Sequence, residues 1–368
     1  MMRLLYIFLS FLFFQPVWGQ NKDLKVSATE MQNIYNAVKT PYKYGLVVVP
    51  STKKHLMDCP SVYKIGHIWY MTYIIFDGVG YETYLAESAD LLNWKTLGKQ
   101  LTAGEGDEWD AKQKAGYNAL IDTKWGGSYK LKKYKGKYWM SYFGGSSEGY
   151  EPEPLSLGIA YTTETPNRPF DWNRIDKPVL SSEDVDIRWW ENRHKLFKSY
   201  IIEDPSRNTG HRFIMYYNAV GDSLENNKPT RWYERIGMAV SDDMVKWKRY
   251  LQDPVVHHPV GITGDPMIQR INNTWVMFYF GAFWKDRGGA FNRFAASKDL
   301  IHWTDWEGED LISSTEPYDA QYAHKSFVIK HKGIVYHYYC AVDKDGNRGI
   351  ALATSKDIGK SVLNFVKE

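Results

Sequence analysis

Only two cysteines, Cys59 and Cys340, occur in the 368 residues, too few for a disulfide framework or a cysteine-rich zinc module. They could pair in an oxidising compartment, but two buried free thiols are the simpler prediction. A charge excess of one sign is also lacking, because 46 Lys and Arg face 43 Asp and Glu, a net charge of +3. No strong field therefore favours nucleic acid or a membrane surface as a partner.

Motifs for several chemistries are missing as well. No Gly-rich phosphate loop precedes a helix, and no G-x-S-x-G nucleophile elbow occurs. His257-His258 is the only paired histidine, and adjacent residues of a strand point to opposite faces, which argues against metal ligation there. We therefore expect neither a metal nor another cofactor. For the carboxylates expected in a central channel, we favour a solvated or salt-bridged cluster. A structural cation that they coordinate stays the alternative.

Long apolar runs are absent beyond the N-terminus. There Arg3 is followed by an apolar run from Leu4 to Phe14, with small residues near its end, up to Gly19. This pattern is typical of a cleaved secretory signal, and the run is too short to span a bilayer as a helix. We predict a signal peptide at residues 1–19, no membrane insertion, and a secreted or periplasmic protein.

Aromatic residues, in contrast, are abundant: 15 Trp, 27 Tyr and 16 Phe, or 16% of the chain. Wide rings pack well on half-buried strands, so this composition favours a β-rich fold. Aromatic rings also provide the flat apolar faces on which sugars stack, which is a fainter indication of carbohydrate binding.

An internal repeat organises the chain. The motif Ser-x-Asp-x-x-x-Trp occurs at Ser88 to Trp94, Ser241 to Trp247 and Ser297 to Trp303, and Ser355-x-Asp357 is a copy without the Trp. A variant runs from Thr163 to Trp172. Each unit has the same order along the chain. An apolar strand comes first, then an aromatic strand, then a strand of small residues, and the motif follows. Ser and Asp suit turns in which their side chains bond backbone amides, so we expect these motif residues to be structural.

Five such units predict an all-β fold, a five-bladed β-propeller. A two-sheet sandwich is the alternative, but sandwiches do not usually repeat one unit five times, and radial repetition leaves few exposed sheet edges. We place the propeller, a single catalytic domain, at residues 45–368. An extension at residues 20–44 with one helix, Ala28 to Val38, precedes it, and we expect a monomer. Gly98 to Tyr117 and Ser181 to Lys195 are candidate long insertions that wall the site.

Candidate site residues lie where a propeller brings its blades together. The inner strand of each blade starts at one rim of the channel, and the loop between the second and third strands opens on the same rim. The predicted inner-strand starts are Asp58, Lys198, Asp265 and His324-Lys325, with only Trp125 and Ser128 at the aligned place of blade two. The loops of blades one to four add Asp77, Glu82, Glu148, Glu151, Glu153, Glu225, Glu234, Lys285, Asp286 and Arg287. Acids, lysines, a histidine and aromatics on one axis form the mixed pocket that sugar chemistry requires.

At this point the motifs resemble a known group. Met57-Asp58-Cys59-Pro60 and Gly264-Asp265-Pro266 resemble the Asp-Pro inner-strand starts of the five-bladed propeller glycosidases, which include glycoside hydrolase families 32, 43, 62, 117 and 130. The Ser-x-Asp-Leu-x-x-Trp blade ends are similar too, and the resemblance covers residues 45 to 360. In family 43 the base is the inner-strand Asp of blade one, which implies that role for Asp58. Lys198 departs from the family pattern, which has a Glu there.

Glycoside hydrolase family 137, β-L-arabinofuranosidases that act on pectin side chains, is similar in placing two glutamates on neighbouring blades. Glu234 with Glu151 or Glu153 is the matching pair. We therefore expect an exported glycoside hydrolase that releases a terminal sugar, such as arabinofuranose, from a plant polysaccharide. These glutamates would be the acid and the base or nucleophile. Asp58 as the base is the competing assignment.

Further roles concern substrate binding. We predict that Asp265, Lys198, His324, Lys325, Glu153 and Trp232 contact an oligosaccharide or polysaccharide substrate. Candidates for sugar stacking are Trp109, Trp125, Trp189, Trp190, Trp232 and Trp284, whereas Trp69 and Trp275 are predicted to lie in the core. Two other function classes stay open. One is a glycoside phosphorylase with Lys198, Lys325 and Arg287 around phosphate, and the other is a non-catalytic carbohydrate-binding propeller.

Overall fold

The computed structural model describes residues 24–222, 233–285 and 287–366. The predicted signal peptide lies outside these residues, as do the site candidates Glu225, Trp232 and Asp286. Both cysteines are buried and free, as predicted.

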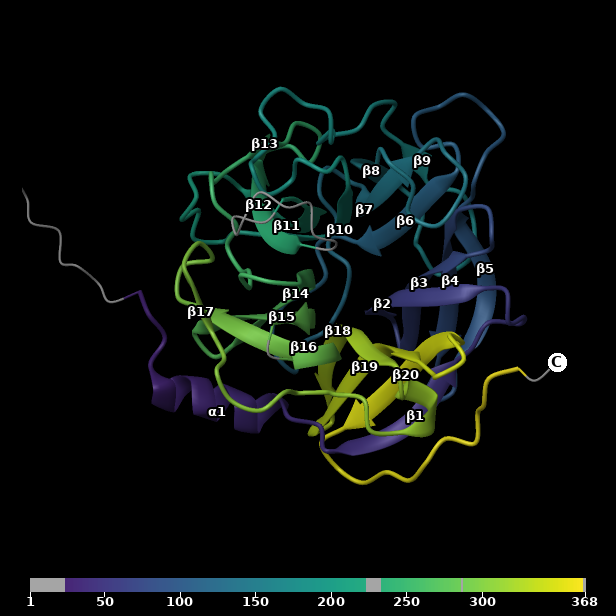
Figure 1. The fold of residues 1–368 in the computed structure, drawn as a ribbon, viewed down its shortest axis with the longest axis vertical. Helices are drawn as coiled ribbons and strands as arrows, with labels where there is room; N and C mark the ends of the chain where they lie inside the picture. The colour runs from purple at the N-terminus through teal and green to yellow at the C-terminus, as the bar shows by residue number, and fades with distance from the viewer. Residues whose placement is uncertain (1–23, 223–232, 286, 367–368) are drawn as a thin grey trace, which may run out of the picture.

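Five antiparallel blades of four strands surround a central axis, which confirms the five-bladed propeller, and the third and fourth blades are joined into one sheet by a single parallel pair, Glu234 with Ile262 (Figure 1). Blade one consists of β2 (Leu56–Ile65), β3 (Ile68–Phe76), β4 (Tyr81–Ser88) and β5 (Lys95–Leu101). Blade two consists of β6 (Gln113–Asn118), β7 (Tyr138–Gly145), β8 (Ser156–Thr162) and β9 (Asn173–Arg174). Blade three consists of β10 (Leu196–Glu203), β11 (Phe213–Val220), β12 (Glu234–Ser241) and β13 (Lys248–Arg249). Blade four consists of β14 (Ile262–Ile271), β15 (Thr274–Trp284), β16 (Arg287–Ser297) and β17 (Trp303–Asp305).

The fifth blade joins the two ends of the described chain. It consists of β18 (Tyr322–His331), β19 (Ile334–Val342), β20 (Arg348–Thr354) and β1 (Tyr42–Val48). The strand β1 pairs antiparallel with β20 as the outermost strand of that sheet. Closing the ring with a strand from the start of the chain covers an edge that would otherwise expose unpaired backbone groups.

One α-helix, α1 (Ala28–Val38), precedes the propeller and has the predicted bounds. The Ser27 side chain caps it by accepting a hydrogen bond from the Glu30 N–H at 3.3 Å. The helix buries Met31, Ile34 and Val38 in the same core cluster as strands of the propeller. This apolar face is what holds the helix, because eleven residues alone are marginal as a helix in water.

The repeated motif forms turns, as the sequence predicts. Ser88 Oγ accepts hydrogen bonds from the N–H groups of Asp90 and Leu91, and Asp90 Oδ1 accepts from the two N–H groups that follow. The Trp94 indole N–H donates to the Leu91 carbonyl at 3.3 Å. The copies in blades three and four make the same serine and aspartate contacts. The motif is therefore structural.

The inner strands of four blades share one irregularity that matters for the site. Their register shifts between Asp58 and Ser61, Leu196 and Ser199, Gly264 and Met267, and His324 and Phe327. In each case the inner strand has one residue more than its partner, which defines a β-bulge. Bulges re-aim the neighbouring side chain, and here they do so near the start of the inner strand.

Blade two departs from the sequence alignment. Its inner strand is β6, whereas Trp125 and Ser128 lie in the loop beyond it, so their predicted place at an inner-strand start is wrong. The stretch Gly98 to Tyr117 is likewise no long insertion, since it contains parts of β5 and β6. The physical reason is that β6 is buried throughout but has the polar sequence QKAGYN, which gives no apolar signal.

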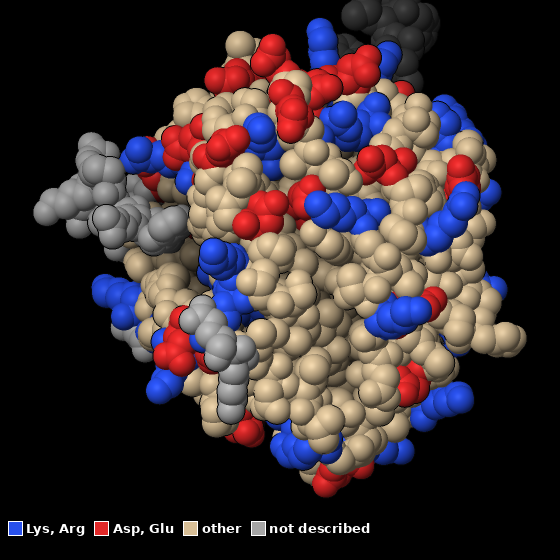
Figure 2. Space-filling view, turned by 90° about the vertical axis from the view of Figure 1, so that its right-hand side faces the viewer, with Lys and Arg blue, Asp and Glu red and all other residues tan. Residues whose placement is uncertain are grey.

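Trp69 and Trp275 are buried in the core, as predicted. On the surface, basic and acidic side chains are interspersed over the face that Figure 2 presents. Among the described residues, no helix has the length and apolar character to cross a membrane.

Candidate active site

A cavity of about 280 Å³ opens at the end of the channel where the inner strands start. Six predicted site residues line it: Glu151, Lys198, Glu234, Asp265, His324 and Lys325. Of the other three, Asp58 is fully buried and does not line the cavity, Glu153 is exposed outside it, and Trp232 is outside the described residues. The structure therefore brings together side chains from blades two to five that are far apart in sequence.

The bulges supply the cavity floor. The residue that follows the last regular pair is Cys59, Phe197, Asp265 or Lys325, and all four line the cavity. This register places Asp58 level with Gly264 and His324, and Cys59 level with Asp265. The sequence alignment of Asp58 with Asp265 is thus off by one residue, because Asp58 is separated from the following proline by Cys59. A thiol, not a carboxylate, occupies the blade-one position.

Glu234 is the first residue of β12, where a strand end fixes it at the cavity. Its side chain is 8% exposed, and its Oε2 accepts a hydrogen bond from the Asn218 amide at 2.8 Å. Burial, with the charges of Glu151 and Asp265, raises the pKa of Glu234 to about 8. The carboxyl is therefore protonated at neutral pH, the state that a general acid needs.

Glu151 comes from the loop between β7 and β8. It lines the cavity, and its Oε1 accepts a hydrogen bond from the Tyr81 hydroxyl at 3.4 Å. Burial raises its pKa, although the charge of Lys325 acts in the opposite direction. Glu153 of the same loop is 54% exposed at its side chain and lies 3.8 Å from Lys195. Of the two alternatives in this loop, the cavity receives Glu151.

Asp58 forms the centre of a charge cluster next to the cavity. Its Oδ2 accepts hydrogen bonds from Lys325 Nζ at 2.9 Å and from Arg348 Nη1 at 3.1 Å. Burial alone would raise the pKa of Asp58, but the two cations lower it below its ordinary value. An ionised carboxylate so well neutralised is a weak proton acceptor, and it is suited to orienting the two cations.

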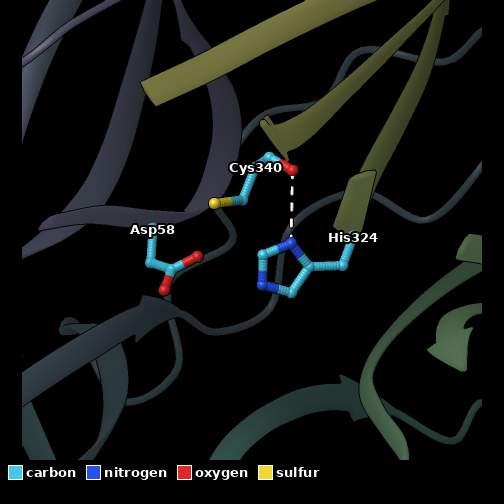
Figure 3. A group of neighbouring side chains, drawn as sticks. All are labelled: Asp58, His324 and Cys340. Atoms are coloured by element: carbon cyan, nitrogen blue, oxygen red, sulfur yellow. Dashed lines mark hydrogen bonds between the residues drawn. The ribbon is translucent and has the colours of Figure 1, made fainter. Parts of the chain in front are cut away.

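Figure 3 shows Asp58 together with His324 and Cys340, whose donor atoms all lie within 4.8 Å of one another. The His324 Nδ1 lies 3.3 Å from the Cys340 carbonyl oxygen, and burial lowers the pKa of this imidazole to about 3. The donor set could suit a metal, but Lys325 and Arg348 already place two positive charges on Asp58. Their repulsion opposes a further cation at this position.

Lys198 and Asp265 provide a second polar pair at the cavity. The Lys198 Nζ lies 3.9 Å from Asp265 Oδ2 and has no hydrogen-bond partner among the described residues. The Cys59 thiol donates to the same oxygen at 3.2 Å. A carboxylate that accepts beside an ammonium that donates can bind two neighbouring hydroxyl groups of a sugar.

Aromatic contacts in the cavity come from tyrosine and phenylalanine, namely Tyr117, Phe143, Tyr150, Phe197, Phe280, Phe283 and Tyr322. None of the five described tryptophan candidates for sugar stacking lines it. Trp125 stacks on Phe278, and Trp190 is 1% exposed. Trp109 stacks on Tyr142, and the indole N–H groups of Trp189 and Trp284 bond to Asp253 and to the Ile262 carbonyl.

Among the lining residues that sequence reasoning missed are Tyr117, Tyr150, Asn218 and Arg348. Arg348 stands where the loop between the second and third strands of blade five ends, so the rule applied to blades one to four would have found it. Asn218 had a weaker signal, an amide inside the otherwise apolar strand β11. Tyr117 was hidden because β6 itself was not recognised.

Comparison with solved structures gives the family. A structure described as a glycoside hydrolase is 47% identical, with a TM-score of 0.89, and the match covers 93% of this chain and 99% of that one. A structure of BT0996 described as a complex with RGII matches with the same identity, coverage and TM-score. The catalytic domain of the Coprinopsis cinerea family 62 α-L-arabinofuranosidase is 10% identical over 88% of this chain and 99% of that one, with a TM-score of 0.60, a likeness of fold alone.

No family model and no curated protein sequence matches the chain. The family is nevertheless shown by the two relatives at 47% identity, which the chain covers almost completely. The propeller fold and its carboxylate-lined cavity agree with this assignment. This protein belongs to the five-bladed propeller glycoside hydrolases.

Proposed function

We propose that this hydrolase releases a terminal furanosyl residue, such as arabinofuranose, from a plant polysaccharide. Glu234 acts as the general acid, and Glu151 acts as the base or nucleophile. The observation that carries the proposal is that both carboxyl groups face one cavity, with the pKa of Glu234 raised to about 8. A protonated and an ionised carboxyl are the two groups that glycoside hydrolysis uses.

The size of the cavity supports a terminal residue. About 280 Å³ lies at the lower end of small-ligand pockets and suits a single sugar ring. The relative in complex with RGII supports a polysaccharide as the source of that sugar. Asp265 and Lys198 then hold its hydroxyl groups, while Asp58 orients Lys325 and Arg348 from outside the cavity.

Water is the acceptor in this proposal. Of the three cations predicted to hold phosphate, Arg287 forms an ion pair with Asp310 and does not line the cavity. Lys325 is engaged by Asp58, which leaves Lys198 as the cation without a hydrogen-bond partner among the described lining residues. Arg348 also lines the cavity, but like Lys325 it is paired with Asp58, so the charge of both cations is largely offset before a phosphate could bind.

The test is a panel of 4-nitrophenyl glycosides and RGII-derived oligosaccharides. We expect turnover of arabinofuranosides, at one anomeric configuration, and much slower turnover of the matching pyranosides. Glu234→Gln and Glu151→Gln should each lose about 10²–10⁴-fold in kcat while staying folded. Glu153→Gln is the matched control on the same loop and should keep full activity.

Other outcomes would reassign the site. If Asp58→Asn alone were inactive and both glutamine variants stayed active, the base would be Asp58 and the glutamate pair would be wrong. Preference for pyranosides would leave the glycosidase intact but overturn the furanoside assignment.

We also propose that the enzyme is exported, on the strength of Arg3 and the apolar run up to Phe14. N-terminal sequencing of the mature protein should then begin near Gln20. A retained Met1 would contradict export.

A further inference from the structure

Arg348 links three blades at the cavity. Its Nη1 donates to the Tyr150 hydroxyl of blade two at 2.9 Å and to Asp58 Oδ2 of blade one at 3.1 Å. The guanidinium also lies 5.4 Å from the centre of the Tyr150 ring. The Arg348 side chain is 18% exposed, and its hydrogen bond to the buried Asp58 is partly shielded from water, whereas the bond to Tyr150 is exposed.

Tyr150 is packed where the arginine holds it. Its ring meets Phe76 edge-on at 5.4 Å and Tyr81 at 6.0 Å, both from blade one. The next residue in the chain is Glu151, and the Tyr81 hydroxyl reaches Glu151 Oε1 at 3.4 Å. Blades one and five therefore hold Tyr150 and Glu151, while Gln113 of β6 holds the preceding part of the loop by donating to the Ser147 and Gly149 carbonyls at 2.8 and 3.1 Å.

The backbone of Glu151 requires such support. Its φ is +50°, in the left-handed region that residues other than glycine rarely adopt. A conformation of this kind persists only when surrounding contacts fix it. The supporting side-chain contacts of Tyr150 and Glu151 are those with Phe76 and Tyr81 of blade one and that of Tyr150 with Arg348, and the neighbouring Gly149 N–H donates to the Val79 carbonyl at 2.7 Å.

We infer that Arg348 is a positioning residue, which fixes Tyr150 and thereby holds the Glu151 carboxylate in the cavity. The inference rests on the proposed role of Glu151. It assigns to blade five a function in catalysis although Arg348 itself touches only Tyr150 and Asp58 among the described hydrogen-bonding groups.

Arg348 also acts through its charge. It lowers the pKa of Glu151, as do Lys325 and Lys195, whereas burial and Asp58 raise it. The remaining titratable groups that face this carboxyl are Glu234, Tyr81 and Tyr150. Removing the cation should therefore make Glu151 harder to ionise.

Three variants separate geometry from charge. Tyr150→Phe removes the hydroxyl but keeps the ring contacts, and should lower kcat about tenfold with little change in KM. Arg348→Lys keeps the charge and should lower kcat without moving the acidic limb of the pH–rate profile. Arg348→Gln removes the charge and should also move that limb upward by about one pH unit. Glu148→Gln is the matched control, because its exposed ion pair with Lys112 ties the same loop outside the cavity.

The outcomes distinguish this inference from the proposed function. An active Glu151→Gln would overturn both. An inactive Glu151→Gln with a normal kcat for Tyr150→Phe, or with an unmoved acidic limb for Arg348→Gln, would overturn the positioning role alone. If Arg348→Gln did not fold, Tyr150→Phe and Arg348→Lys would still decide the question through kcat and the acidic limb.

Discussion

At the outer turns of blades one, three and four, each Ser-x-Asp motif bonds to amides two and three residues ahead. In the cavity, Glu234 is bonded to Asn218, sixteen positions away, and Asp58 to Lys325 and Arg348, more than 260 positions away. The turns are local and complete. The cavity is assembled from distant blades, and Lys198 Nζ and Asp58 Oδ1 have no hydrogen-bond partner among the described residues. Such incomplete pairing costs stability, and at Lys198, which lines the cavity, it leaves a donor free to meet a ligand.

The two regions also lie at opposite ends of the blades. In blade one Asp58 pairs with Ile74 at one end of the sheet, whereas Ser88 pairs with Trp69 at the other. The comparison shows that the residues repeated from blade to blade stabilise the fold, whereas the residues of the cavity, which differ between blades, carry the chemistry. Changes in the cavity should affect activity or a buried charge balance, and changes in the turns should affect stability alone.

The largest expected effect concerns pH. Because the pKa of Glu234 is raised to about 8, the acid form needed for catalysis is present below that value and is lost above it. We expect kcat/KM to fall about tenfold per pH unit above pH 8. The free enzyme's profile measures this limb directly. A basic limb that persisted in Glu234→Gln at residual activity would show that another group causes it.

The second effect is the loss of a buried partner. Lys325→Met leaves Asp58 with Arg348 alone in a site without exposure to water. Because Arg348 still compensates part of the Asp58 charge, we expect a loss of about 3 kcal/mol of the free energy of unfolding, the lower end of the cost of breaking a buried pair. Urea denaturation should reveal it. Arg168→Gln is the control, since its exposed pair with Glu164 should contribute at most about 1 kcal/mol.

The local turns could be predicted from the sequence, whereas the cavity that distant blades assemble could be predicted only in part. The five blades were predictable because Ser, Asp and Trp recur at fixed spacing and bond to their own neighbours. The bulges were not, because they appear only when strands are paired, and one extra residue at Cys59 shifted the alignment of Asp58. The polar strand β6 and the contact of Arg348 with Tyr150 likewise depend on distant parts of the chain, which local patterns do not encode.

The third effect tests a turn. Asp90→Ala removes the acceptor for the exposed N–H groups of Leu92 and Asn93 and should cost about 0.5–1.5 kcal/mol of stability, with unchanged kcat/KM. Asp357→Ala is the control, because the incomplete motif there bonds one amide, that of Gly359.

The dependence of this effect on pH has a defined sign. Although burial alone would raise it, hydrogen bonds from Asn93 and Leu92 lower the pKa of Asp90 to about 2, below the ordinary value of 3.8. Its contribution is therefore present above about pH 4 and is lost as the pH falls through about 2. An equal difference between wild type and Asp90→Ala at pH 7 and pH 2 would contradict this account.

The smallest effect on stability should come from Lys198, and it tests a cavity residue whose ammonium has no hydrogen-bond partner among the described residues. Its side chain is 2% exposed, and the ammonium has one carboxylate partner, Asp265 at 3.9 Å, and the Tyr117 ring at 5.6 Å, so its burial is poorly compensated. Lys198→Met keeps the length of the side chain and should change the free energy of unfolding by less than about 1 kcal/mol, in either direction. If the ammonium donates to a sugar hydroxyl, KM should rise about tenfold. Lys114→Met is the matched control, because that lysine is equally buried but donates to the Thr102 carbonyl at 2.8 Å outside the cavity. Lys114→Met should lose stability and keep its KM. If instead Lys198→Met lost stability and kept its KM, Lys198 would serve the fold rather than the substrate.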